Sequence, residues 1–233
     1  INADHWDDLI VGCSAGGRLH VFLNDQNGGF RQLQGSQVAQ DDVASIFSLG
    51  TGKGNESFTI NCGYEGTGGV MLTRHQLVEE KILSDNVMNI PIKSVGTVAQ
   101  TDIDGDGDLD LFVVSGGVEC QPGDKILQDR LYLNDGYGKF SRAVSSLLPK
   151  MNDSGSIVAA ADINKDGKLE LFIGGRVVPG SYPEEPRSYL LTNSGPRFVD
   201  ATEDMGPELK RAGMVTSALF SDVDGDNWVD LLV

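Results

Sequence analysis

An acidic nine-residue motif occurs three times in this chain at a constant spacing, and it constrains the fold more than any other feature. The copies are Asp102–Asp110, Asp162–Glu170 and Asp222–Asp230, so each begins 60 residues after the one before. An elaborate loop that returns at a fixed period is typical of repeat proteins, in which every repeat is one supersecondary unit. The sequence therefore predicts a repeat architecture.

The motif has the oxygen pattern of a site for a hard cation. Acidic or amide side chains stand at positions 1, 3, 5 and 9, and the main-chain carbonyl of position 7 would add another oxygen. Ligation by oxygen alone suits Ca²⁺, whereas Mg²⁺ keeps its waters and Zn²⁺ prefers nitrogen or sulfur. Gly105 and Gly107 allow the positive φ that such a tight loop needs. We therefore predict three Ca²⁺ sites. The predicted ligands are Asp102, Asp104, Asp106, Asp108 and Asp110 in the first copy, Asp162, Asn164, Asp166, Lys168 and Glu170 in the second, and Asp222, Asp224, Asp226, Trp228 and Asp230 in the third.

The three copies differ in ways that predict an order of affinity. The first copy has four carboxylates and two glycines, and we expect it to bind most tightly. In the third, Asn227 takes the position that Gly107 has in the first. The second replaces a carboxylate with Asn164 and places Lys165 and Lys168 nearby, where each would repel the ion. We expect this copy to bind most weakly.

Two further stretches look like reduced versions of the same loop. Residues 2–11 align with residues 224–233, which makes Asn2, Asp4 and Asp8 possible ligands of a degenerate site that lacks its first carboxylate. This alignment places the start of the chain inside a loop, and we expect the chain to be an excerpt of a longer array. Residues 49–57 keep the glycines but not the carboxylates, so no ion is expected there.

An EF-hand, whose loop begins in a similar way, is excluded by two features. It requires a bidentate Glu at position 12 and a helix on each side. Position 12 is Val113, Ile173 and Val233 in the three copies. The flanks, such as residues 157–160 and 171–173, are short and rich in β-branched residues, which favours strands.

The strand pattern predicts an all-β fold, namely a β-propeller of four-stranded antiparallel blades. The expected blades are residues 1–42, 43–92, 93–152, 153–212 and 213–233, of which the first and last are incomplete, within a single propeller domain or fragment. We expect the first strand of each blade to be innermost and the second to be apolar on both faces. Further strands are expected at 78–83 and 214–221, and helix only as a turn near 208–211.

Composition excludes several classes of protein. The net charge of −16 argues against binding to nucleic acid or to anionic membrane surfaces. No apolar run approaches the roughly 18 residues of a membrane span. Three cysteines are too few for a disulfide framework, and their odd number leaves at least one unpaired within the chain.

The acidic loop between two strands, followed by the stretch Leu131–Phe140, resembles the FG-GAP/VCBS propeller repeat of integrin α-chains and many secreted bacterial proteins. Residues 198–206 and 228–232 are most similar to bacterial relatives of cartilage acidic protein. The resemblance covers nearly the whole chain, although residues 43–92 have no metal loop. It implies an extracellular Ca²⁺-binding propeller, typically of seven blades, of which this chain would supply about four.

Ligand binding is expected on the face opposite the metal loops. Because successive strands run antiparallel, the connections between second and third strands lie on that face, and two of them are long, residues 116–130 and 174–187. Arg176, Tyr182 and Arg187 are candidate contacts there for a carboxylate or a sugar. Ordinary surface insertions are an equally good explanation of these loops.

Two functional hypotheses follow. The first is a calcium-binding, extracellular, cell-surface or periplasmic module that binds protein or glycan, is not an enzyme, and self-associates through open blade faces. The second is the propeller of a polysaccharide-active enzyme of lyase or dehydratase type. His5, His20 and His75 lie in different units, and no nucleophile elbow, phosphate loop or zinc spacing is present.

Overall fold

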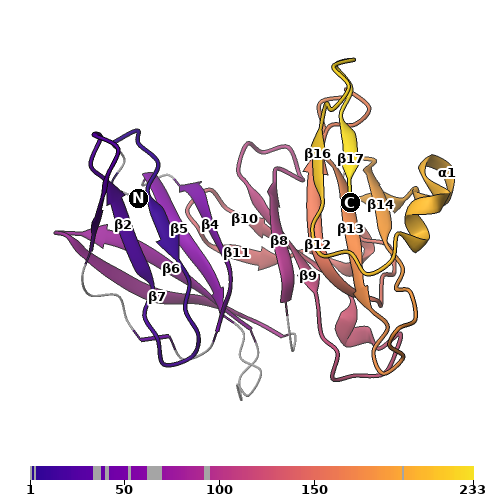
Figure 1. The fold of residues 1–233 in the computed structure, drawn as a ribbon, viewed down its shortest axis with the longest axis horizontal. Coiled ribbons are helices and arrows are strands. Elements are labelled where there is room, and N and C mark those ends of the chain that lie inside the picture. The colour runs from indigo at the N-terminus through magenta and orange to yellow at the C-terminus, as the bar shows by residue number, and fades with distance from the viewer. Residues whose placement is uncertain are drawn as a thin grey trace. The chain divides into compact units, whose positions relative to one another are not determined.

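The computed structural model describes residues 2, 4–33, 38–39, 42–51, 54–61, 70–91, 95–195 and 197–233. Over these residues the regular elements are mostly antiparallel strands, as predicted (Figure 1). Loops flanked by strands confirm that the acidic motifs are not EF-hands. No helix in the described part of the chain has the length and apolar character needed to cross a membrane.

Three sheets have four strands each, in sequence order, and we call their strands A to D. The blades are β4 (Val43–Thr51), β5 (Gly54–Asn61), β6 (Val70–Val78) and β7 (Lys81–Ile90); β8 (Val95–Thr101), β9 (Asp110–Ser115), β10 (Arg130–Asn134) and β11 (Phe140–Arg142); and β12 (Ser154–Ala161), β13 (Glu170–Val177), β14 (Tyr189–Asn193) and β15 (Phe198–Asp200). Two smaller sheets are β1 (Leu9–Val11), β2 (His20–Asn24) and β3 (Phe30–Gln32), and β16 (Leu219–Ser221) with β17 (Asp230–Leu232).

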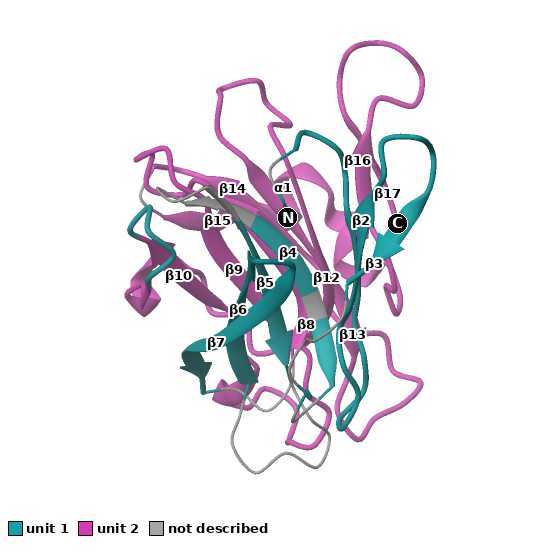
Figure 2. Cartoon of the chain, turned by 90° about the vertical axis from the view of Figure 1, so that its left-hand side faces the viewer, with its two compact units in different colours: residues 1–94, 135–139 teal, residues 95–134, 140–233 magenta. Residues whose placement is uncertain are grey.

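The chain divides into two compact units, which Figure 2 colours separately. Unit 1 comprises residues 1–94 and 135–139, and unit 2 comprises residues 95–134 and 140–233. The boundary at 94/95 lies two residues from the predicted boundary between the second and third blades. The single domain over 1–233 stays a prediction.

In unit 2 the B strands form the centre of the core. All six residues of β9 are buried, as are the first six of β13, which confirms that B strands are covered on both faces. Phe112, Leu171 and Tyr189 belong to the hydrophobic core of this unit, in which both blades take part. Strands β8 and β12 approach so closely that a Cβ added to Gly96 would lie 2.7 Å from the carbonyl oxygen of Gly155. Only glycine fits at this crossing.

In unit 1 the second blade departs from the expected strands. The decayed loop expected over 49–57 is not seen in its described residues, 49–51 and 54–57, where β4 and β5 stay paired, with Thr51 opposite Gly54. The strand predicted over 78–83 is also wrong, because the chain turns at Glu79 and Glu80, where φ is 48° and 61°, and pairs Val78 with Lys81. Without carboxylates to hold a cation, residues 49–51 and 54–57 remain in the β ladder.

Three expectations for unit 2 need correction. Residues 174–177 belong to β13 rather than to a loop. Residues 214–218 are not strand, because the Val215 N–H donates to the Gly175 carbonyl of the preceding blade at 2.9 Å. A short helix α1 (Thr202–Met205) precedes the 3₁₀ turn η3 (Pro207–Arg211), where only a turn was expected. Two further 3₁₀ turns are η1 (Lys125–Leu127) and η2 (Ser145–Leu147).

Candidate metal centres

The loop between β8 and β9 turns its carboxylates inward. Asp102 accepts the N–H of Gly105 at 2.7 Å on one oxygen and the N–H of Gly107 at 3.0 Å on the other. The N–H of Asp106 donates to Asp104 Oδ1 at 3.3 Å. These bonds collect the side chains of Asp102, Asp104 and Asp106, each of which offers an oxygen within 4.8 Å of the other two. Three convergent carboxylates form a donor set that fits a hard cation.

The loop between β16 and β17 repeats this arrangement. Asp222 accepts the N–H of Gly225 at 2.8 Å and that of Asn227 at 2.9 Å. Asp222, Asp224 and Asp226 again bring one oxygen each within 4.8 Å of the others, and all three side chains are exposed. The second donor set therefore fits the same kind of cation.

The loop between β12 and β13 has the same skeleton with one carboxylate fewer. The N–H of Asp166 donates to Asp162 Oδ1 at 3.0 Å and to Asn164 Oδ1 at 2.9 Å. Gly167 N–H donates to Asp162 Oδ2 at 2.9 Å. The amide of Asn164 thus stands where the other loops have a carboxylate, which reduces the negative charge available to an ion.

Two backbone positions in every loop have positive φ. At position 4, φ is 81° at Gly105, 60° at Lys165 and 81° at Gly225. At position 6, φ is 92° at Gly107 and 68° at Asn227. The prediction that glycine is used where the backbone is left-handed is confirmed. Lys165 and Asn227 adopt the same conformation in the other two loops at some steric cost.

The position-9 side chain ties each loop to the sheet beneath it. Asp110 is fully buried and accepts the N–H of Ile103 and the N–H of Asn134, both at 2.9 Å. Glu170 accepts the N–H groups of Ile163 and Asn193 in the same way. In the 222 loop, Asp230 accepts the N–H of Val223 at 2.9 Å. Position 9 therefore has a structural role; metal ligation by this residue stays a prediction.

Burial and mutual repulsion act on the loop carboxyls. Burial raises the pKa of Asp104, and the neighbouring Asp106 and Asp102 charges raise it further. Burial also raises the pKa of Asp110 and of Glu170, against the backbone N–H bonds that lower it. A cation bound among these groups would relieve the repulsion.

The first residues form the partial loop that the alignment predicts. Asp4 Oδ1 accepts the N–H of Trp6 at 3.0 Å, as Asp226 Oδ1 accepts that of Trp228 at 2.7 Å. His5 has φ 69°, matching 68° at Asn227. Asn2 donates its amide to Asp4, and Asp8 accepts the N–H of Asn24 at 2.9 Å. The correspondence with residues 224–230 is therefore structural, whereas ion binding there stays a prediction.

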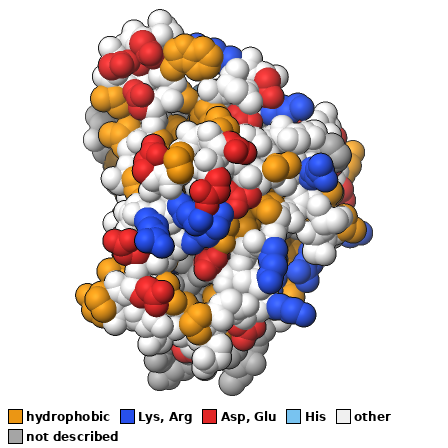
Figure 3. Space-filling model, turned by 90° about the vertical axis from the view of Figure 1, so that its right-hand side faces the viewer, with side chains coloured by type: hydrophobic (Ala, Val, Ile, Leu, Met, Phe, Trp, Pro, Cys, Tyr) orange, Lys and Arg blue, Asp and Glu red, His pale blue; other side chains and the backbone are white. Residues whose placement is uncertain are grey.

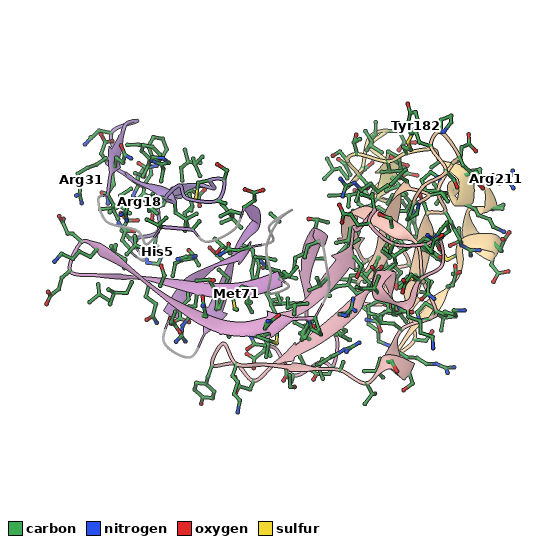
Figure 4. All side chains as sticks on the ribbon, turned by 90° about the horizontal axis from the view of Figure 1, so that it is seen from below. His5, Arg18, Arg31, Met71, Tyr182 and Arg211 are labelled. Carbon is green, nitrogen blue, oxygen red and sulfur yellow. The ribbon has the colours of Figure 1, made fainter. Side chains whose placement is uncertain are left out.

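The three candidate ligand contacts differ in their surroundings. Tyr182 is 76% exposed and lies at the outer edge of unit 2 (Figure 4). Arg176 donates to the carbonyl of Gly116 at 2.6 Å. Arg187 forms an ion pair with Asp200 at 2.7 Å, with its guanidinium 4.6 Å from the ring centroid of Tyr189. Both arginines thus join parts of unit 2, although Arg176 is itself exposed, whereas no contact of this kind holds the exposed ring of Tyr182 among the described residues.

A buried acidic group that the sequence did not predict lies at the end of the blades opposite the metal loops. Asp129 directly precedes β10 and accepts the N–H of Ser115 at 2.8 Å. Burial raises the pKa of Asp129 to about 8, and the nearby Asp153 charge contributes; Arg130 lowers it. Asp153 in turn accepts the hydroxyl of Tyr189. In sequence, Asp129 is an ordinary loop residue before a strand and gives no signal of its burial.

The comparisons with known proteins agree with this geometry. Residues 102–173 match the family model described as the FG-GAP-like repeat. This part of the chain is therefore similar to the FG-GAP-like repeat. It begins at the first carboxylate of one metal loop and ends in the B strand of the next blade, so it contains two of the three loops.

Among solved structures, the chain is similar to a protein of Thermus thermophilus that is assigned as an oxidoreductase (glucose dehydrogenase). The TM-score is 0.50 at 15% sequence identity, over 81% of this chain and 59% of that one. The chain thus spans less than two thirds of that protein, and the likeness concerns the fold alone. No curated protein matches the chain. With its four-stranded antiparallel sheets, the chain has the architecture of β-propeller blades.

Proposed function

We propose that this chain is a calcium-stabilised β-propeller module that acts outside the cytoplasm and binds a protein or glycan ligand. The observation that supports it best is the recurrence of one loop geometry in unit 2, with carboxylate oxygens gathered at Asp102–Asp106 and at Asp222–Asp226. Such loops are suited to Ca²⁺ at the millimolar concentrations found outside cells.

The side chains at positions 1, 3 and 5 would hold the ion, together with the carbonyl of position 7. The ion would supply positive charge to a loop whose carboxylates otherwise repel one another. The chain's own residues already close each loop, because position 1 accepts two backbone N–H groups and position 9 attaches the loop to its sheet. The role proposed for the ion is therefore stability, with tightest binding in the 102 loop and weakest in the 162 loop.

Ligand recognition is proposed for the opposite face, through the connection that contains Tyr182. Its ring is exposed, and it lies on a rigid blade whose B strand is buried along its first six residues. On the face of the molecule shown in Figure 3, acidic and basic side chains are interspersed. A ligand with both polar and apolar groups, such as a sugar or a peptide, suits an exposed tyrosine, which offers an aromatic ring and a hydroxyl, while the net charge of −16 disfavours a polyanion.

Thermal melting tests the calcium role. For a Kd of about 10⁻⁴ M and roughly 1.5 mM free Ca²⁺, each site contributes about 1.6 kcal/mol of stability, or about 5 kcal/mol for three. We expect a clearly higher Tm in about 2 mM Ca²⁺ than in excess chelator. Equal melting temperatures would refute the calcium role. Titration calorimetry should give three sites per chain.

A glycan array tests the binding role and separates it from the enzyme alternative. We expect retention of one glycan or protein class that weakens in Tyr182→Ala while the melting temperature stays the same. The same glycans are incubated with the protein and monitored for the ultraviolet absorbance of unsaturated uronates. Steady production of such uronates would favour the polysaccharide-active enzyme and contradict the binding module.

A further inference from the structure

The metal loops of the last two blades are in contact through two side chains whose roles the metal sites do not explain. The ammonium of Lys165, in the 162 loop, lies 3.7 Å from the centroid of the Trp228 ring, in the 222 loop. Lys165 occupies position 4, where Gly105 and Gly225 stand in the other loops. The left-handed backbone there favours glycine, so the lysine is not explained by local conformation.

The position of this ammonium is unexpected from charge alone. Lys165 lies between Asn164 and Asp166 and is three residues from Asp162, all predicted ligands. An ammonium on a flexible four-carbon stem would find its strongest attraction among those carboxylates. Within the described residues, however, it makes no ion pair with a carboxylate and instead lies over an aromatic ring of the neighbouring loop.

We propose that Trp228 is a positioning residue for the 162 loop, which holds the Lys165 ammonium away from the carboxylates and so keeps that loop able to bind a divalent cation. The proposal rests on the calcium role proposed above. Without the ring, the ammonium would return to Asp162 and Asp166 and compete with Ca²⁺ as a tethered cation. An exposed cation–π contact corresponds to about a two- to fivefold change in an equilibrium constant.

The test resolves each loop separately by NMR titration of the full ¹⁵N-labelled chain with CaCl₂. The amide of Gly167 reports the 162 loop, because its N–H donates to Asp162 Oδ2 at 2.9 Å. The amide of Gly107 reports the 102 loop as an internal reference. We expect Trp228→Leu to raise the Ca²⁺ concentration for half-saturation at Gly167 by about two- to fivefold, with no change at Gly107.

A double substitution distinguishes positioning from a general structural effect. With Lys165→Met there is no ammonium to compete, so adding Trp228→Leu should leave the Gly167 midpoint where Lys165→Met alone puts it. Lys165→Arg should behave as the starting protein, since a guanidinium also stacks on an aromatic face. Trp6→Leu is the matched control: Trp6 holds the same position in the partial loop and is 50% exposed, against 47% for Trp228.

The outcomes separate this inference from the function on which it rests. If no loop glycine of the starting protein responds to Ca²⁺, both proposals fail. If all respond but Trp228→Leu leaves the Gly167 midpoint unchanged, the positioning role alone is refuted. An equal shift from Trp228→Leu with and without Lys165 also refutes it, because the ring would then act through the backbone of the loops.

Discussion

At the scale of single residues, the carboxylate at position 9 joins its own loop to the neighbouring strand. Asp110 is buried with both oxygens engaged by backbone N–H groups, one from its own loop and one from the end of β10. A carboxylate suits this position because it accepts on both oxygens, which an amide cannot do. The loop is therefore closed by the fold itself before any ion binds.

Asp110→Asn should destabilise the chain by about 1–3 kcal/mol, because one buried N–H would then face an amide NH₂ and lose its acceptor. The measurement is urea unfolding in excess chelator, which removes any contribution from bound metal. Asp108→Asn, in the same loop and without this pair of bonds, is the control and should change stability little. Equal losses of stability in the two variants would contradict the proposed role of Asp110 in attaching the loop to the sheet.

Asp129 should make stability depend on pH. Its pKa is raised from 3.8 to about 8, mainly by burial, so the folded state binds the proton more tightly than the unfolded state does. The sign follows from linkage: its contribution is fully present below about pH 4 and is lost as pH rises toward about 8. In the next blade the N–H of Gly175 donates to the neutral hydroxyl oxygen of Ser188 at 3.0 Å, so no charged acceptor is used there.

Asp129→Asn should therefore flatten this dependence. We expect wild type to lose stability relative to the variant between about pH 5.5 and about pH 8.5, measured by urea unfolding at both values in excess chelator. A difference between the two proteins that is the same at both pH values would show that the Asp129 carboxyl does not titrate in this range.

The chemistry of the loops could be predicted from the sequence because it is local. Positions 1, 3, 5 and 9 lie within nine residues, and the oxygen pattern is visible without the fold. The partners that define the other polar residues are distant in sequence: Asn134 lies 24 residues from Asp110, and Arg187 lies 13 residues from Asp200. A single sequence carries no signal for such pairs. For this reason Arg176 and Arg187 could be identified from the sequence only as candidate ligand contacts.

At the scale of elements, tight turns determine where the strands end. In the second blade one strand is expected over residues 78–83, but Glu79 and Glu80 form a two-residue turn with positive φ at both positions. Such turns usually carry Asn-Gly, and this pair is the signal by which a sequence reveals them. Two glutamates give no such signal, and the predicted strand is therefore misplaced.

Glu79→Asn with Glu80→Gly should stabilise this hairpin by about 1 kcal/mol, because glycine and asparagine adopt the left-handed conformation at lower steric cost than glutamate. The double substitution removes the ion pair of Glu80 with Arg31, whose side chains are 72% and 53% exposed, and such pairs contribute little. The measurement is the melting temperature. Glu80→Ala is the control: it removes the ion pair and keeps the strain, so it should give no increase. A lower Tm for the double variant would contradict the expectation.

At the scale of the whole molecule, the period of the motif was sufficient to predict the architecture. In both complete blades of unit 2, a metal loop between strands A and B places the two strands, and the B strand is buried on both faces. The irregular connections could not be predicted, because their course depends on the neighbouring blade. Val215 illustrates this, since its N–H bonds to the preceding blade and the expected strand begins later than predicted.

The sheet of β16 and β17 should mediate self-association. Leu219 and Leu232 are directly opposite each other across the two strands and are 61% and 45% exposed, so they form an apolar pair on one face. Burying such a pair against a second copy is favourable, and a short open sheet offers unpaired backbone groups as well.

We expect sedimentation velocity to show a larger species whose fraction increases with protein concentration. Leu219→Lys with Leu232→Lys should shift the distribution to monomer, since charges on a packed apolar face are costly to bury. Val144→Lys, at a residue that is 67% exposed in another connection, is the matched control and should have no effect. A wild-type protein that stays monomeric over the whole concentration range would contradict association, and association that persists in the double lysine variant would place the interface elsewhere.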